Sequence, residues 1–509
     1  MSQTIEALPL PAAASARTLA TGHADTFGHP APLWLLFLTE FWERFAFYGM
    51  RWALTLYIVA QFHAGAGSGE APANRIYGAY LALVYGAGLF GGFVADRVLG
   101  AQRAILLGAV IMAGGLCLLV VPQIDLFLCG LALVVVGNGL FKPNISALVG
   151  QLYPPGDARR DAGFTIFYMG INAGAFVSPL LTGWLASAWS ATPLEQNYRA
   201  VFLAAACGML LSFVWFWFGR HRLGAVGATP PHARGARPVL NVTLLALFAT
   251  PLVYLVLAKL GAAALAWALG LLWLGLAALL LREGARDGAV ARDRVAAMLL
   301  VFLLNTVFWM FFEQAGSSFN FLAEKMVVRR FGEWEFPVAW FQSVNSLAVI
   351  ALAPLVAACW MRLARRGRPP SIPFKFGSGM LFNAAAFLLL MYAFAHLVDA
   401  QQKIPFWTLS AVYVLQSLGE LCLSPIGLSM TTKLAPTRCA GLAMGGWFLS
   451  VANGNNLSGL FASEVSGATG MTAASAAAGY AFGFWALGAA ALALFLAAPA
   501  INRLMHGVR

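Results

Sequence analysis

Fourteen long apolar stretches run through this sequence, and they restrict its fold more than any other feature. A helix needs about 20 apolar residues to cross the ~30 Å of hydrocarbon in a membrane. Lipid offers no hydrogen-bonding partner to free backbone groups, so membrane-spanning segments form helices or closed barrels. Barrel strands alternate apolar and polar residues over about ten positions, whereas these stretches are continuous and longer. We therefore predict an all-α polytopic membrane protein with spans at 33–62, 76–95, 104–121, 127–150, 162–190, 200–218, 240–258, 262–281, 296–322, 337–361, 373–395, 405–432, 440–462 and 475–500.

The composition excludes an ordinary soluble domain. Charged residues make up 10% of the chain, against about 25% in soluble globular proteins. The net charge is +12, but the Lys and Arg residues lie mainly in short segments between apolar stretches. We therefore interpret them as orientation signals and expect no nucleic-acid partner. With the N-terminus inside, the inner segments hold 22 Lys and Arg residues and the outer loops hold 7, which predicts cytoplasmic termini.

The spans fall into two groups of six on either side of an unusual pair. A segment rich in Gly, Pro, His and Arg follows the sixth span and has the composition of a linker. The next two spans carry almost no polar residues, so we expect them to form a peripheral hairpin beside two facing six-helix bundles. The predicted organisation is a flexible cytoplasmic tail (1–32), an N-terminal bundle (33–218), a cytoplasmic linker (219–239), the extra hairpin (240–281), a C-terminal bundle (282–500) and a cytoplasmic C-terminus (501–509).

Seven charged side chains lie deep inside the predicted spans, namely Glu40, Glu43, Arg44, Arg51, Lys142, Glu313 and Glu420. Each costs about 2.5–3.5 kcal/mol at the membrane centre even on the insertion scale, so such groups need partners or water. They usually mark paths for ions or polar solutes. The first bundle supplies a surplus of cations and the second supplies two lone acids. We predict a water-filled cleft with walls of opposite charge, which can hold a zwitterionic solute or close by ion pairing.

The first span concentrates this chemistry on one helix face. Glu40 and Arg44 are four residues apart with the acid first, the better orientation for a helical ion pair. Glu43, Tyr48 and Arg51 extend the same stripe. A carboxylate that gains and loses a cation partner can take up and release a proton. The alternative is a purely structural ion-pair lock, and a structural role is also the alternative for Lys142 in the fourth span.

Patterns for other kinds of chemistry are missing from the sequence. It contains no HExxH, GxSxG or phosphate-binding loop pattern, so we expect no enzyme. The six cysteines show no CxxC pairing and lie mostly in apolar stretches, so we expect neither disulfides nor a metal site.

Three motifs resemble those of the proton-dependent oligopeptide transporter family of the major facilitator superfamily, and the likeness covers nearly the whole chain beyond residue 33. Glu40-xx-Glu43-Arg44-Phe45 is similar to the family's ExxERF signature, which is highly specific. Residues 91–97, with Gly100 and Arg103, are similar to the superfamily's loop motif between spans two and three. Residues 167–174 are similar to the FYxxINxG signature. The extra pair of helices is also typical of bacterial members.

The resemblance implies a role for each charged residue. It implies proton coupling by Glu40, Glu43, Arg44 and Glu313, the last paired with Arg51. It implies that Arg51 and Lys142 bind a peptide carboxylate and that Glu420 binds a peptide amino group. The implied pocket residues are Tyr48, Tyr85, Asn172, Asn345, Ser424 and Trp447. For Tyr85 and Trp447, the sequence alone favours packing in the membrane core.

Two positions depart from the family pattern. Phe47 stands where the family often has a tyrosine, and Ala175-Phe176 follows Gly174 where the family often has Ser-Leu. Either change could shift peptide preference, but neither removes a charged role.

The predicted function is proton-coupled symport of di- and tripeptides by alternating access in a bacterial inner membrane. We expect a monomer in contact with membrane lipid and no cofactor other than protons. The alternative within transport is a proton-coupled carrier of another small organic or inorganic anion such as nitrate. Nitrate needs cations but no amine receptor, so Glu420 argues against it. A passive channel would show no dependence of flux on a pH gradient.

Overall fold

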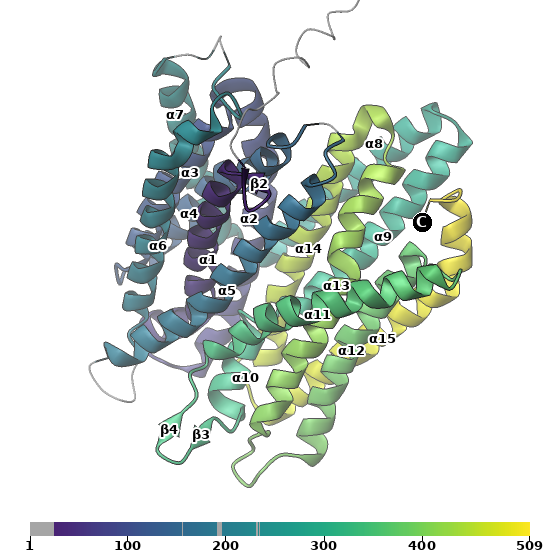
Figure 1. The fold of residues 1–509 in the computed structure, drawn as a ribbon. Helices are drawn as coiled ribbons and strands as arrows, with labels where there is room; N and C mark the ends of the chain where they lie inside the picture. The colour runs from purple at the N-terminus through teal and green to yellow at the C-terminus, as the bar shows by residue number, and fades with distance from the viewer. Residues whose placement is uncertain (1–24, 155, 191–195, 231–232, 234, 509) are drawn as a thin grey trace, which may run out of the picture.

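The computed structural model describes residues 25–154, 156–190, 196–230, 233 and 235–508, and these are almost wholly helical (Figure 1). The first half contains α1 (Pro32–Phe62), α2 (Glu70–Val94), α3 (Ala101–Leu119), α4 (Ile124–Gln151), α5 (Arg160–Ala188) and α6 (Tyr198–Gly219). The second half contains α9 (Ala289–Phe312), α10 (Ser318–Met326), α11 (Trp340–Arg365), α12 (Ile372–His396), α13 (Phe406–Leu434), α14 (Ala440–Ser466) and α15 (Ala473–Leu504). Two further helices, α7 (Arg237–Leu255) and α8 (Gly261–Arg286), lie between the halves in the sequence.

Each of the fourteen predicted spans coincides with helix, which confirms the predicted fold class. One span is corrected: the segment 296–322 is two helices, α9 and α10, separated by a break at 313–317. Among the described residues, eleven helical stretches are long and apolar enough to cross a membrane. Helix α1, with its four charged residues, and helix α14, rich in Asn, Ser and Gly, are outside that set. Their polar content indicates helices that face the interior of the protein.

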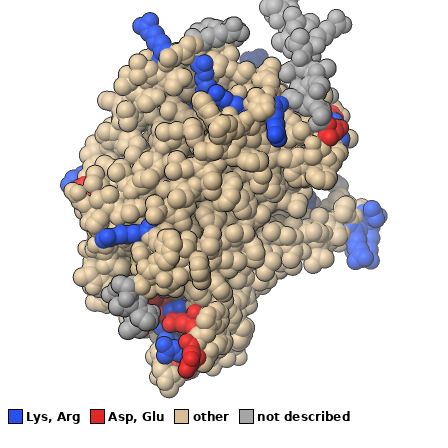
Figure 2. Space-filling model, turned by 60° about the vertical axis from the view of Figure 1, so that its left-hand side comes forward, with Lys and Arg blue, Asp and Glu red and all other residues tan. Residues whose placement is uncertain are grey.

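The surface fits a membrane environment. Figure 2 shows one face that is largely free of Lys, Arg, Asp and Glu, with most of the visible charged side chains near its margins. Large apolar side chains point outward from the helices, including Trp267 on α8, which is 78% exposed. Lipid tails can cover such an apolar surface, whereas its exposure to water would be unfavourable.

Hydrogen bonds join the two halves toward one end of the molecule. We call this the distal end. It carries the short antiparallel pair β3 (Arg330–Phe331) and β4 (Trp334–Glu335), and the terminal end, opposite it, holds the start of α1 and the end of α15. The Trp340 indole donates to the Leu180 carbonyl at 3.1 Å, and the Asn320 amide donates to the Trp52 carbonyl at 2.8 Å. In Figure 1 the ribbons of the halves converge at the distal end and diverge toward the terminal end.

A glycine pair forms a close helix crossing between the halves. Gly78 on α2 faces Gly459 on α14, and a Cβ added at Gly459 would lie 2.5 Å from the Asn74 carbonyl oxygen and 2.7 Å from the Gly78 Cα. The Asn74 side chain also donates to the Ala462 carbonyl at 3.1 Å. Any larger residue at 78 or 459 must therefore push the two backbones apart.

We expect Gly459→Val to weaken closure at the distal end, because overpacking a tight contact costs about 1–3 kcal/mol. Spin labels at Gln61 and Gln401, one in each half, should report a longer mean distance in the variant, in a background without exposed native cysteines. Gly114→Val is the matched control, since a Cβ at Gly114 meets no atom within 4 Å. Identical distance distributions in all three proteins would contradict this role for the crossing.

The extra helices α7 and α8, predicted as a peripheral hairpin, pack mainly on other helices of the molecule. Helix α7 packs on α4, while α8 packs mainly on α14 and α9 and also touches α2. The Tyr254 hydroxyl donates to Asp125 at 2.7 Å on one side, and the Asn456 amide donates to the Ala262 carbonyl at 2.8 Å on the other. Their connection turns at Gly261, whose φ is +72°, a value that favours glycine.

The predicted flexible tail also needs correction at its end. Residues 1–24 lie outside the described part of the chain, but β1 (Asp25–Thr26) and β2 (His29–Pro30) form a two-stranded turn ahead of α1. This turn docks on the connection between α4 and α5. Arg159 pairs with Asp25 at 2.8 Å, and the His29 ring lies 2.9 Å from the Tyr153 hydroxyl. The local sequence gave no sign of these partners, which come from residues more than 120 positions away.

Candidate functional site

The ExxER stripe of α1 forms a buried charge cluster with α4. Glu40 and Glu43 are fully buried. Arg44 donates to Glu43 at 2.6 Å and lies 3.5 Å from Glu40. From α4, Lys142 pairs with Glu40, and the Asn138 amide donates to Glu43 at 3.2 Å. Two acids and two cations balance, so this cluster carries no net charge.

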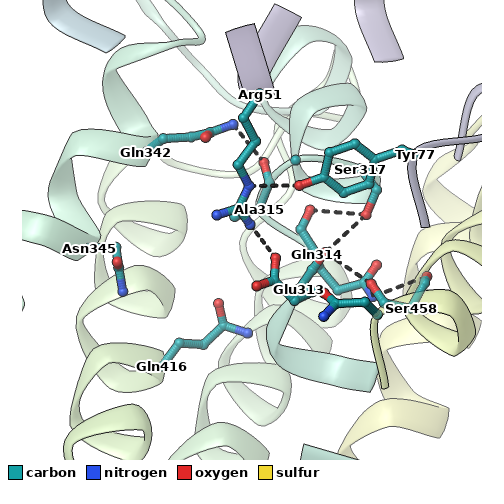
Figure 3. A network of polar contacts seen from close by, with 12 residues as sticks. Arg51, Tyr77, Glu313, Gln314, Ala315, Ser317, Gln342, Asn345, Gln416 and Ser458 are labelled. Carbon is teal, nitrogen blue, oxygen red and sulfur yellow. Dashed lines mark hydrogen bonds and ion pairs between the residues drawn. The ribbon is translucent and has the colours of Figure 1, made fainter. Parts of the chain in front are cut away.

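Arg51 is the cation left over from that balance, and it reaches across to the second half. Its guanidinium pairs with Glu313, at the end of α9, and also donates to the Tyr77 hydroxyl at 2.6 Å (Figure 3). Arg51 is 9% exposed and Glu313 is 4% exposed. The predicted closure by opposite charges across the halves therefore exists in the structure, as an ion pair between α1 and the break after α9.

The break at 313–317 is held open by side chains from several helices. The Glu313 carbonyl accepts from the Ser458 hydroxyl at 2.9 Å, and the Gly316 carbonyl accepts from Thr55 at 3.2 Å. The Gln342 amide donates to the Ala315 carbonyl at 3.0 Å (Figure 3). Irregular backbone at membrane depth is stable only where protein or water satisfies its polar groups. The break therefore needs both halves in place, and it aims Glu313 at Arg51.

A small pocket opens beside this ion pair. It is lined by Tyr48, Arg51, Phe312, Ala315, Gln342, Asn345, Ser346, Tyr413 and Gln416. Three of the predicted substrate residues, Tyr48, Arg51 and Asn345, are in this lining. Asn345 also links the pocket to Glu420, since its amide donates to the Glu420 carboxylate at 3.4 Å and to the Ser417 hydroxyl at 2.9 Å. The pocket thus has a cation on one wall and an acid behind the other.

The structure puts the remaining predicted residues elsewhere. Lys142 pairs with Glu40 and is not part of the pocket lining. Asn172 donates to the Tyr168 carbonyl of its own helix at 3.0 Å. Tyr85 packs against the apolar core, and the Ser424 hydroxyl is buried without a hydrogen-bond partner among the described residues.

Trp447 lies in the apolar core of the second half. It is 3% exposed and packs against Phe302 and Phe376, with ring centroids 5.8 Å and 6.3 Å apart. This is the packing environment that the sequence alone favours for it. A role for Trp447, Tyr85, Asn172 or Ser424 in substrate binding therefore remains a prediction from the motif and has no support from contact with this pocket.

Several residues of the site were not predicted. Gln342 and Gln416 line the pocket, Tyr77 binds Arg51, and Ser458 supports the break. The amides of Gln342 and Gln416 sit in apolar spans, so a search for uncharged polar groups at membrane depth would have found them. Tyr77 and Ser458 carry no such signal, because Tyr and Ser are common in membrane helices.

Phe47, which replaces a common family tyrosine, contacts the charge cluster through its ring. The Arg44 guanidinium lies 4.8 Å from the Phe47 ring centroid, and the Arg51 guanidinium lies 5.7 Å from that of Tyr48. Aromatic faces attract cations at such distances. The lost hydroxyl therefore leaves a contact with Arg44 in place.

Known proteins share both sequence and fold with this chain. The sequence pattern that defines the POT family matches residues 102–477. The peptide transporter YePEPT of Yersinia enterocolitica is 35% identical over 470 residues, which cover 87% of this chain and 89% of that protein. Dipeptide and tripeptide permease A of Proteus mirabilis is 32% identical over 441 residues, covering 86% and 87%. A solved structure of a peptide transporter POT in complex with sulfate superposes with a TM-score of 0.81 at 34% identity, covering 95% of this chain and 98% of that one.

Proposed function

Because the chain belongs to the POT family, we propose that it moves di- and tripeptides into the cell together with protons, by alternating access. The proposal includes a bacterial inner membrane as its location, with both termini in the cytoplasm, and a monomer as the working unit. The observation that carries it is the Arg51–Glu313 ion pair, which joins the two halves beside the pocket. The names of the similar proteins, peptide transporter and dipeptide and tripeptide permease, support the substrate class.

A peptide has one charge of each sign at its ends, and the site offers a partner for each. Arg51 lines the pocket and suits a carboxylate, since a guanidinium can donate two parallel hydrogen bonds to it. Glu420 lies behind Asn345 on the other side and suits an ammonium group. The aromatic and amide side chains of the pocket wall are weakly selective, which fits a carrier of many peptide sequences.

Proton coupling follows from the same ion pair. A proton on Glu313 removes the negative charge that holds Arg51, so Arg51 becomes free to bind the peptide carboxylate. The link between the halves at the distal end is then weaker, and alternating access can proceed. The cluster of Glu40, Glu43, Arg44 and Lys142 can exchange partners in the same way. Protons are the coupling ion in this scheme, and we propose no other cofactor.

Transport of nitrate or another small anion is the less favoured function. Such a substrate would bind to Arg51 or Lys142, but it has no ammonium group for Glu420 to bind. The similar proteins named here are peptide transporters, which also disfavours the alternative.

Uptake of labelled Ala-Ala into proteoliposomes, with and without an imposed inward proton gradient, tests the proposed function. We expect accumulation above the outside concentration only with the gradient. An excess of unlabelled tripeptide should compete with the label, and an excess of nitrate should not. Flux that ignores the gradient would contradict coupling, and competition by nitrate alone would favour the anion carrier.

The amine-receiving role of Glu420 gives a further prediction. Acetylation of the amino group of Ala-Ala should weaken binding to the native protein about tenfold or more, because a hydrogen bond to a charged group contributes ~1.5–3 kcal/mol. In Glu420→Ala the same acetylation should have little effect, since the partner is already gone. Competition against labelled Ala-Ala measures both affinities. Exposed Glu333→Ala is the control, and an equal penalty for acetylation in Glu420→Ala would remove Glu420 from this role.

A further inference from the structure

A second hollow lies on the outer side of the second half, away from the substrate pocket. It is a groove of about 450 Å³ between α9, α14 and α15, within the ~300–1,000 Å³ range of small-molecule sites. Its lining is mostly apolar and includes Met310, Leu457, Phe461, Ala478 and Phe482. Phe482 is 58% exposed, so the groove is open to the membrane side of the protein.

The lining changes from polar to apolar along the membrane normal. Its two polar members, Glu464 and Ser475, lie at the distal end, since α14 ends at Ser466 and α15 begins at Ala473. Leu457 lies nine residues before the end of α14, which is ~13 Å deeper at 1.5 Å per residue. A ligand that fits this gradient has a polar head at the membrane surface and a hydrocarbon tail inside.

The charged side chains at the distal end of the groove indicate which lipid headgroup it can bind. Glu464 has an 83% exposed side chain and lies 4.0 Å from Arg75, whose side chain is 52% exposed. Arg75 is held by the Ser463 hydroxyl, to which it donates at 3.1 Å. An exposed ion pair of this kind contributes little by itself, so both groups can bind a ligand. A carboxylate beside a guanidinium complements a head that carries an ammonium and a phosphate.

We propose that this groove binds one acyl chain of a phospholipid with an ethanolamine headgroup, from the leaflet at the distal end. The ammonium faces Glu464, the phosphate faces Arg75, and the chain lies along Ala478, Phe461 and Met310. A free fatty acid fits less well, because its carboxylate would face that of Glu464. A glycerol headgroup has no ammonium to offer.

The bound chain would lie one layer behind the break that carries Glu313. The Met310 carbonyl accepts from the Gln314 amide at 2.9 Å. That amide also donates to the Ser458 hydroxyl at 3.0 Å (Figure 3). Ser458 in turn supports the Glu313 carbonyl. A lipid in the groove therefore packs against Met310, whose carbonyl holds the Gln314 amide next to Glu313.

Native mass spectrometry of the purified full-length protein, titrated with phosphatidylethanolamine or phosphatidylglycerol, tests the proposal. The native protein should retain phosphatidylethanolamine in preference to phosphatidylglycerol. Ala478→Trp fills the groove and should lower phosphatidylethanolamine retention about tenfold, equal to ~1.4 kcal/mol of binding free energy. Glu464→Gln should keep lipid binding but lose most of the preference between the two headgroups.

Ala489→Trp is the matched control, because Ala489 is also exposed on α15 but lies seven residues, about two turns, beyond Phe482, the last lining residue. It should retain lipid as the native protein does. Equal retention by Ala478→Trp and Ala489→Trp would overturn the site. An unchanged headgroup preference in Glu464→Gln would overturn the assignment of the head. Because the readout is lipid binding, neither result depends on whether the protein carries peptides.

Discussion

Glu313→Gln should abolish proton-driven accumulation of dipeptide while leaving a folded protein that still exchanges peptide across the membrane. Glutamine has nearly the same shape and can accept a hydrogen bond from Arg51, but it carries no charge and cannot take up a proton. Removing one partner of a buried ion pair costs about 3–5 kcal/mol, because the other charge stays buried and uncompensated. Because the side chain at position 313 then cannot take up a proton, we expect gradient-driven uptake of Ala-Ala to fall by about 100-fold or more.

Two measurements on the same proteoliposomes distinguish coupling from binding. Uptake driven by an inward proton gradient reports coupling, and exchange of labelled for unlabelled dipeptide without a gradient reports the substrate cycle alone. Glu333→Gln is the control, since it makes the same chemical change at an exposed position. If Glu313→Gln accumulates peptide like the native protein, Glu313 has no part in proton coupling.

The sequence predicted the parts of this molecule that depend on local pattern. Apolar length identified the helices, and intramembrane charge identified the residues that meet at the centre. The stripe from Glu40 to Arg51 was predicted from helical spacing, and the structure has the Glu40–Arg44 contact at 3.5 Å. The pairing of Arg51 with Glu313 was expected from the family resemblance and from opposite charge, and the structure contains it.

Features that depend on distant partners escaped prediction. The break at 313–317 interrupts a segment predicted as one span, although its Glu, Gln, Gly and Ser residues lower the local hydropathy. It is stabilised by Thr55, Gln342 and Ser458, which satisfy its carbonyls. No window of the local sequence contains those three residues together. The docking of residues 25–30 and the packing of α7 and α8 on other helices have the same origin, since each depends on a surface formed by another part of the chain.

Lys142 shows that the sequence alone does not predict which ion pair a buried charge will form. Its positive charge within a membrane span predicted a functional role, and the family motif implied that it binds the peptide carboxylate. In the structure it pairs with Glu40, and its charge makes the cluster neutral. The sequence shows how many charges there are, but their division into a balanced cluster and one surplus cation, Arg51, depends on how the helices pack.

That balance leads to the second large effect, which we expect from Lys142→Ala. Loss of this cation leaves the fully buried Glu40 with Arg44 alone, at 3.5 Å, and Arg44 is already bound to Glu43. One Glu40 oxygen, Oε2, has no hydrogen-bond partner among the described residues even in the native protein. Breaking a buried pair costs ~3–5 kcal/mol, so we expect a lower melting temperature and a loss of dipeptide uptake of about 100-fold.

A double variant separates the structural role of this pair from its transport role. Glu40→Gln with Lys142→Gln removes both charges and restores neutrality, so that no buried charge is left without its partner. We expect its melting temperature to return close to the native value while proton-driven uptake stays absent, because neither group can then hold a proton or a peptide carboxylate. Thermal unfolding in detergent and uptake in proteoliposomes measure the two quantities separately. Recovery of uptake together with stability would mean that Glu40 and Lys142 form only a structural lock, and that coupling is confined to Arg51 and Glu313.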